Sequence, residues 1–168
     1  MNQDMSVGCG EGFLNIRVGA IIFQDGKILM VTNDRVDYYY SIGGRIKMGE
    51  TAQEAIVREV YEETGYIMSV DRLGFIHENY FYGDAKSNKD KLIYEISFYF
   101  IMNVPKDFYP ITQSTTEDHD QETYFWTDLK TSAKLYPEFF KTHDLANSQS
   151  VIHLVTDQRK KRMNTCKG

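Results

Sequence analysis

The chain has 168 residues, 42% of them hydrophobic and 26% charged, which is enough to bury the core of one domain. Its formal net charge of −5 gives no overall attraction to nucleic acid or to an anionic membrane. No run approaches the roughly 18 apolar residues of a membrane helix, and the first residues do not form a signal peptide. We expect one cytoplasmic domain over residues 1–168, with loose termini at 1–12 and 158–168.

Two β-prone segments open the chain. Asn15–Phe23 and Lys27–Thr32 flank the turn signal Gln24-Asp25-Gly26, which predicts a hairpin. A shorter β-prone run, Tyr38–Ile42, then leads into the glycine pair Gly43-Gly44.

A helix follows the glycines. Thr51 and Glu54 have the spacing of a capping box, and Gly65 stands where a left-handed residue ends a helix. These signals predict a helix from Ala52 to Thr64.

The second half of the chain is mainly β-prone. Ile67–Tyr82 and Leu92–Val104 are long enough to form a hairpin around the polar residues 83–90. Thr123–Thr127 predicts a short strand, and Leu135–His143, with Pro137 near its start, predicts a second helix. This order of elements predicts an α/β fold in which helices pack on the faces of a mixed sheet.

Three glutamates of the predicted helix share one face. Glu59, Glu62 and Glu63 have the spacing i, i+3 and i+4, so they fall within roughly 100° of arc. For three glutamates alone, a solvated acidic face is the better interpretation. A divalent cation such as Mg²⁺ or Mn²⁺ would instead relieve their repulsion and bridge them to phosphates.

The residues around the glutamates decide between these interpretations. They follow the pattern Gly-x5-Glu-x7-Arg-Glu-hydrophobic-x-Glu-Glu-x-Gly-hydrophobic over 44–66, from Gly44 to Tyr66. A chance match of the seven invariant positions has a probability on the order of 10⁻⁸ per starting position. The stretch resembles the Nudix box, and the chain resembles a Nudix hydrolase of the MutT type over most of its length. Tyr66 is a mild departure, because an aliphatic residue is more usual there.

The resemblance implies an α/β/α sandwich with a central mixed sheet. It also implies metal-dependent hydrolysis of a nucleoside diphosphate derivative, in which water attacks a phosphorus of the pyrophosphate. Mg²⁺ or Mn²⁺ is the implied cofactor and a small nucleotide is the implied substrate. A homodimer is compatible with this interpretation.

The resemblance assigns roles to residues of this chain. Glu59, Glu62 and Glu63 would be metal ligands, with the carbonyl of Gly43 as a further ligand. Arg58 would hold Glu59 by a salt bridge, and Glu50 would brace the loop. The general base is left open between a glutamate of the box and an acid of the loop 117–122, in which Glu122 is favoured as base or extra ligand over Asp120. We interpret His119 as an exposed loop histidine.

Aromatic residues near the box are candidates to contact the substrate. We predict substrate contacts at Tyr38, Tyr40 and Arg45, and at Tyr80 and Tyr82 beyond the box. Family rules of thumb place a proline about fifteen residues beyond the box in ADP-ribose hydrolases, and this chain has tyrosines there. This favours nucleoside triphosphates, oxidised nucleotides or dinucleoside polyphosphates as substrates.

A function of another class is the alternative. Some relatives have lost catalysis and act as nucleotide-sensing or protein-binding modules, typically after losing a box glutamate. All the box glutamates are present here, so hydrolysis is preferred.

Overall fold

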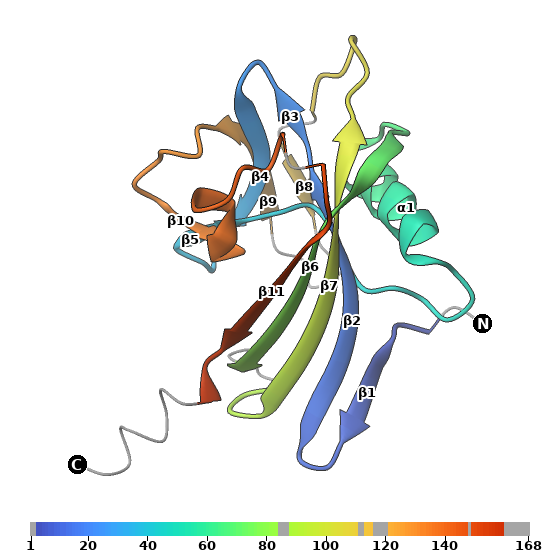
Figure 1. Ribbon diagram of the computed structural model, residues 1–168, viewed down its shortest axis with the longest axis vertical. Coiled ribbons are helices and arrows are strands. Elements are labelled where there is room, and N and C mark those ends of the chain that lie inside the picture. Colours follow the sequence, from blue (N-terminus) through green and yellow to red (C-terminus); the bar gives the residue numbers. More distant parts are fainter. Residues whose placement is uncertain (1–2, 84–87, 111–112, 116–120, 148, 160–168) are drawn as a thin grey trace.

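Two β-sheets and one α-helix make up most of the computed structural model (Figure 1). The structure describes residues 3–83, 88–110, 113–115, 121–147 and 149–159. The first sheet has the strand order β1-β2-β7-β6-β11, and the second has the order β10-β5-β4-β9-β8, with β3 paired to β4. This arrangement confirms the predicted α/β sandwich.

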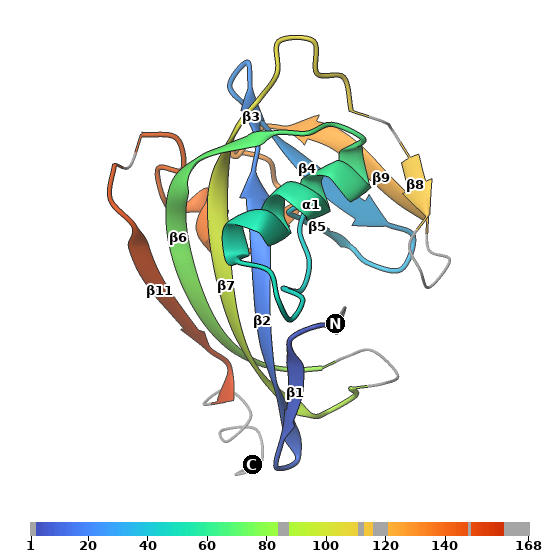
Figure 2. The ribbon, with the colours of Figure 1, turned by 90° about the vertical axis from the view of Figure 1, so that its right-hand side faces the viewer.

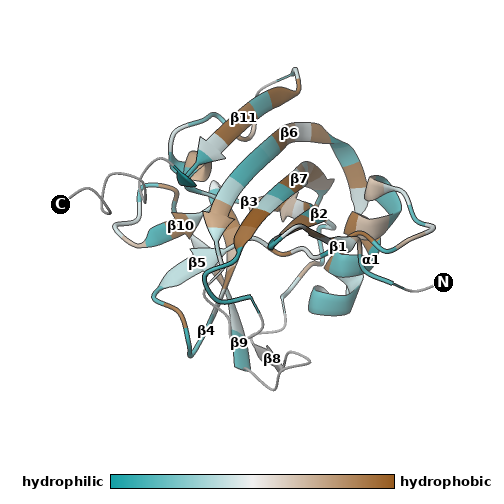
Figure 3. Cartoon of the chain, turned by 90° about the horizontal axis from the view of Figure 1, so that it is seen from below, coloured by the Kyte–Doolittle hydropathy of each residue, from teal (hydrophilic) through white to brown (hydrophobic). Residues whose placement is uncertain are grey.

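The first sheet contains the longest strands. β6 (Ser69–Tyr82) and β7 (Leu92–Asn103) form the predicted antiparallel pair, and β2 (Gly12–Ile21) lies parallel to β7. The edges are β1 (Ser6–Cys9) and β11 (Ile152–Asp157). Viewed from below, hydrophobic and hydrophilic residues follow one another along β6 (Figure 3), because successive side chains of a strand point to opposite faces.

The second sheet is built from shorter strands. They are β3 (Phe23–Gln24), β4 (Lys27–Asn33), β5 (Tyr38–Tyr40), β8 (Gln113–Thr115), β9 (Gln121–Thr127) and β10 (Lys134–Tyr136). Most of its pairs are antiparallel, but β5 and β10 are parallel. Both sheets therefore mix the two strand directions.

The helix α1 (Ala52–Thr64) has the predicted bounds. Thr51 accepts a hydrogen bond from the Glu54 amide while the Glu54 side chain returns one to Thr51, so the capping box is complete. Gly65 has φ = 74°, the left-handed conformation that ends the helix. Figure 2 shows α1 lying across one part of the first sheet and leaving the far ends of its strands uncovered on that side.

Two hydrophobic clusters hold the layers together. One joins α1, through Ile56 and Val60, to the first sheet and to β4. The other joins the opposite side of the first sheet, including Phe75, to Phe139 and Phe140 of the short 3₁₀ helix η1 (Glu138–Lys141). The box helix is consequently fixed on one side of the first sheet only.

Three expectations from the sequence are wrong in detail. Residues Leu135–His143 form no α-helix, because Lys134–Tyr136 pair with β5 and only the 3₁₀ helix η1 follows. The N-terminal residues are not a loose arm throughout, since β1 pairs with β2 from Ser6↔Asn15 to Cys9↔Gly12. The first hairpin is confined to β3 and β4, because β2 pairs with β7 in the other sheet.

Within the described residues no helix is both long and apolar enough to cross a membrane.

One buried histidine links stability to pH. His77 of β6 is 6% exposed, and its Nε2 lies 2.8 Å from Thr156 Oγ1 of β11. Burial lowers the pKa of His77 from 6.5 to about 4. The unfolded chain therefore binds a proton between pH 6.5 and 4 that the folded chain does not, and stability falls as the pH falls through this window.

We predict that the wild-type free energy of unfolding drops by about 2 kcal/mol between pH 7 and pH 5 through His77 alone. His77→Gln, which cannot titrate, removes this part of the decrease. Urea unfolding at the two pH values measures it. The exposed Gln53→Ala, which removes no titratable group, is the control and should keep the wild-type pH dependence. An unchanged pH dependence in His77→Gln would contradict the assignment.

Candidate active site

The glycine loop before α1 is held as an extra strand against β2. Val18 N–H donates to the Gly44 carbonyl at 2.9 Å, and Ala20 N–H to the Ile42 carbonyl at 2.8 Å. Gly43 has φ = 146°, and a Cβ on it would overlap the Val18 carbonyl. A Cβ on Gly44 would instead overlap the Glu59 carboxylate. The two glycines thus allow backbone to lie against β2 on one side and against a box glutamate on the other.

Arg58 connects the loop to the helix glutamates. It donates two hydrogen bonds to Glu50, at 2.6 and 3.0 Å, one to Glu59 at 2.8 Å and one to Glu62 at 3.0 Å. Its remaining nitrogen contact is with the Arg45 carbonyl at 3.2 Å. The Arg58–Glu59 salt bridge is therefore present, and Glu50 joins Arg58 to the loop by also accepting a hydrogen bond from the Lys47 amide.

Glu63 faces a different set of donors. Its Oε1 accepts a hydrogen bond from the Gly43 amide at 2.9 Å, and its Oε2 lies 3.4 Å from the Tyr124 hydroxyl. The same hydroxyl lies 2.9 Å from Glu122, which also accepts a hydrogen bond from Tyr40 at 2.8 Å. Tyr124 therefore links the box to Glu122, although the two glutamates are far apart in the sequence.

The surroundings of these carboxylates shift their pKa values in different directions. Burial raises the pKa of Glu63 to about 8, and burial also raises that of Glu59 despite its bond to Arg58. The hydrogen bonds from Arg58 lower the pKa of Glu50. Burial, followed by the bond to Glu122, raises the pKa of Tyr40. Burial therefore disfavours the charged forms of Glu59 and Glu63, whereas Arg58 favours the charged form of Glu50.

A divalent cation fits the donor set chemically, although the folded side chains are directed at protein donors. Among the described residues, no three His, Cys, Asp or Glu side chains are grouped to hold a metal ion. The reason is that Glu59 and Glu62 both accept hydrogen bonds from Arg58, whereas Glu63 accepts hydrogen bonds from the Gly43 amide and the Tyr124 hydroxyl. The Gly43 carbonyl accepts no hydrogen bond from the described residues. Hard oxygen donors of this kind suit Mg²⁺ or Mn²⁺.

Tyr38, Tyr40 and Arg45 lie close to this centre. Tyr40 contacts Glu122 directly, and the Tyr38 ring is 6.3 Å from Tyr40 and 4.8 Å from Tyr136 of β10. Arg45 follows the glycine pair, and its Nη1 is 3.4 Å from Asp4. Tyr124 and Tyr136 were not predicted from the sequence, because they reach this centre only through the pairing of β9 and β10 with distant strands.

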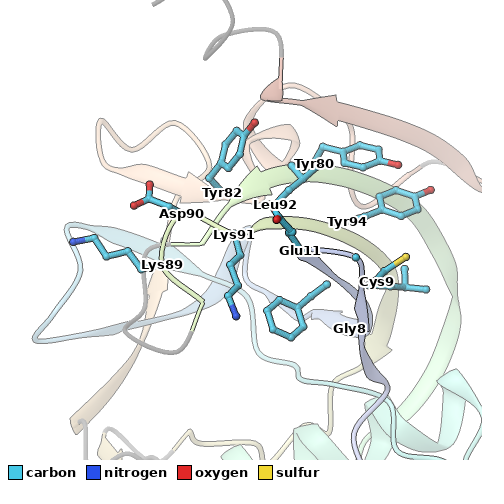
Figure 4. Close-up of a pocket in the computed structure, with 14 residues that line it drawn as sticks. Gly8, Cys9, Glu11, Tyr80, Tyr82, Lys89, Asp90, Lys91, Leu92 and Tyr94 are labelled. Atoms are coloured by element: carbon cyan, nitrogen blue, oxygen red, sulfur yellow. The ribbon is translucent and has the colours of Figure 1, made fainter. Parts of the chain in front are cut away.

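Tyr80 and Tyr82 are not brought to the carboxylates. They line a pocket of about 980 Å³ near the β1–β2 turn, together with Tyr94 (Figure 4). Tyr80 stacks on Tyr94 with ring centroids 4.2 Å apart, and Arg159 covers Tyr80 at 3.7 Å. Through β7, Tyr80 is in register with Leu14, four residues and roughly 13 Å along β2 from the loop contact at Val18.

Part of the predicted acidic loop lies outside the described residues. This applies to Glu117, Asp118, His119 and Asp120, and to the C-terminal residues from 160 onward. Glu122 belongs to β9 and is the acid of this segment whose position is described.

A carboxylate-bearing helix follows a glycine loop and packs on a mixed sheet, and this arrangement defines a class of α/β domain. The NUDIX domain model matches residues 14–146. The chain belongs to the NUDIX domain family.

Individual relatives match shorter segments. An ADP-ribose pyrophosphatase of Methanocaldococcus jannaschii is 33% identical over 92 residues, which cover 53% of this chain and 50% of that protein. A putative 8-oxo-dGTP diphosphatase of Bacillus subtilis is 44% identical over 46 residues, covering 27% and 31%. The chain thus spans half or less of the length of these curated relatives.

The fold comparison extends further. A mutator MutT protein from Bacillus halodurans has a TM-score of 0.61 at 18% identity, with 84% of this chain and 90% of that chain covered. At this identity the likeness establishes the fold.

The glycine pair offers a matched test of the site. We predict that Gly43→Ala destabilises the protein by about 2 kcal/mol or more, because its Cβ meets backbone in a left-handed conformation. Gly44→Ala meets only the flexible end of Glu59, so it should cost little stability. Urea unfolding measures both. Equal losses in the two variants would contradict the different contacts described for the two glycines.

Proposed function

We propose that the protein hydrolyses the pyrophosphate linkage of a nucleoside diphosphate derivative. The substrate classes are nucleoside triphosphates, oxidised nucleotides and dinucleoside polyphosphates. The observation that carries this proposal is the arrangement around Arg58, which gathers Glu50, Glu59 and Glu62 beside the glycine loop. The activities named for the relatives, all of them on pyrophosphate-type bonds, support the same reaction class.

The proposal includes a divalent cation, Mg²⁺ or Mn²⁺. Glu59, Glu62 and Glu63 would hold it, with Glu122 and the Gly43 carbonyl as further oxygen donors. When bound, such an ion neutralises phosphate charge and lowers the pKa of water. To reach it, Glu59 and Glu62 would share their charge between the cation and Arg58, which stays bound to Glu50.

The chain's own residues would orient the reactants. Arg58 is fully engaged by carboxylates and a carbonyl, so its role is to position Glu59 rather than to bind phosphate. Glu122 is held by two tyrosine hydroxyls, which fixes its carboxylate opposite Glu63. That placement suits a base or an added ligand, and a box glutamate is the other candidate for the base.

We predict that Glu62→Gln lowers turnover by at least about 10²-fold, because it removes a metal ligand. Stability should change little, since the Glu62 side chain is 50% exposed and its bond to Arg58 is a surface ion pair. Turnover with Mg²⁺ and thermal unfolding measure the two effects. The exposed Glu138→Gln is the control for the chemical change. Near-normal turnover in Glu62→Gln would remove it from the ligand set.

A substrate panel tests the function itself. Nucleoside triphosphates, oxidised nucleotides, nucleotide sugars, ADP-ribose and dinucleoside polyphosphates are incubated with the protein and Mg²⁺ or Mn²⁺, and phosphate or pyrophosphate release is measured. Hydrolysis that EDTA abolishes is the expected result. A folded protein that hydrolyses no member of the panel would overturn the proposal in favour of a nucleotide-sensing or protein-binding module.

A further inference from the structure

Five polar side chains occupy one face of the first sheet where a hydrophobic core would be expected. Arg17, Ser97 and His77 are direct neighbours across β2, β7 and β6, and Glu95 and Asn79 are neighbours in the next row of the same face. We call these five residues the polar row. On the same face, toward the glycine loop, the preceding row is Gly19, Tyr99 and Phe75, where the core begins.

The polar row adjoins the glycine loop of the candidate active site, on the face of the first sheet opposite α1. The Tyr99 hydroxyl is within hydrogen-bonding range of Ser97 and of Ser41, two residues before Gly43. Arg17 forms a β-bridge with Arg45, and its positive charge acts on Glu59. Along β2, Arg17 is one residue from the loop contact at Val18, and the row of Glu95 and Asn79 is in register with Asn15, three residues from it, so the polar row extends from roughly 3 to 10 Å along the strand. That is the distance over which a nucleoside extends from its phosphates.

Three members of the polar row, Arg17, Glu95 and Asn79, keep hydrogen-bonding capacity. Arg17 Nε and Glu95 Oε2 form an ion pair at 3.8 Å, which is too long for a hydrogen bond, and Glu95 Oε1 accepts one 3.4 Å bond from Ser97. Because a carboxylate has about four acceptor sites, Glu95 can accept further bonds. Asn79 Oδ1 is buried and has no partner among the described residues. By contrast, His77 is bonded to Thr156, and the neighbouring Asn15 accepts a 2.7 Å bond from Ser6. An unpaired polar group inside a protein is costly, as Asn79 Oδ1 is here, and Arg17 and Glu95 beside it can still donate and accept, so the three are suited to a ligand.

The chemistry of these three groups selects a ligand. Glu95 and Asn79 Oδ1 are acceptors, and a carboxylate matches two adjacent N–H donors. Arg17 supplies donors beside them, at 34% exposure of its side chain. Guanine presents this complement, with adjacent N1–H and N2–H donors next to the O6 acceptor. Adenine offers an acceptor at N1, which would face the Glu95 carboxylate unfavourably.

We propose that the polar row binds the base of the substrate and that Glu95, with Arg17, selects a guanine-type base. This rests on the proposed function, since it concerns the same substrate. Glu95 accepts from the two guanine N–H groups and Arg17 donates to O6.

The test compares substrates that differ by single groups. The wild type and Glu95→Gln are assayed with Mg²⁺ on three substrates: GTP, ITP and ATP. ITP differs from GTP only by lacking the 2-amino group. We expect wild-type kcat/KM to favour GTP over ITP by about tenfold or more, the value of a hydrogen bond to a charged group. In Glu95→Gln the ratio should fall to within about threefold, through loss of GTP activity alone. Glu11→Gln, at the exposed β1–β2 turn, is the matched control.

A binding measurement separates the two proposals. Calorimetry with GDP, IDP and ADP in EDTA reports base recognition without turnover, and it is read for the wild type, Glu95→Gln and Arg17→Met. A preference for GDP that both variants lose supports the polar row even if no hydrolysis is seen. An equal GDP-to-IDP ratio in the wild type and Glu95→Gln would overturn it. The affinity for 2′,3′-dideoxy-GDP tests the ribose. If the differences in affinity between nucleotides depend on the ribose hydroxyls, the assignment of the base would also be overturned.

Discussion

The Arg58 guanidinium is the interaction on which the rest of the site depends. Four like charges lie on the last turns of α1, at Glu59, Glu62 and Glu63, and in the loop before the helix, at Glu50, and they would repel one another without a counter-charge. Arg58 binds three of them and also the Arg45 carbonyl. Because this planar group has fixed donor directions, it sets the positions of the carboxylates and of the loop together.

This engagement of Arg58 has a consequence for substrate recognition. A guanidinium that already donates to three carboxylates has no donor left for a phosphate or a base. Recognition must therefore come from neighbouring elements, and the sheet supplies them through β2, β7 and β6. In this arrangement the residues of the box would act on the bond that breaks, and residues of the strands would bind the remainder of the substrate.

The helix and the centre of the site could be predicted because their signals are local. Thr51, Glu54 and Gly65 determine the ends of α1 through short-range hydrogen bonds, and the box places its glutamates by helix periodicity. Leu135–His143 could not be assigned this way, since β10 depends on pairing with β5, about a hundred residues earlier. Tyr124 was missed for the same reason: its contact with Glu63 requires β9 to pair with β4.

The polar row shows a different limit. Leu92–Phe100 is so rich in apolar and aromatic residues that it predicts a buried strand, and Glu95 and Ser97 are inconspicuous within it. Only the register across three strands brings these residues beside Arg17 and Asn79. Tyr80 and Tyr82 alternate with Asn79 along β6, so their side chains lie on the other face of the sheet.

The glycine loop is bonded on both of its edges. Besides its bonds to β2, Met5 N–H donates to the Ile46 carbonyl at 2.7 Å and Met48 N–H to the Gln3 carbonyl at 2.8 Å. The segment therefore resembles an interior strand, and its backbone conformation is determined by the strands on either side of it. A segment held in this way cannot adapt to different ligands by moving. Changes in substrate choice among such domains would then arise from side chains on the adjoining strands, while the backbone around the breaking bond stays constant.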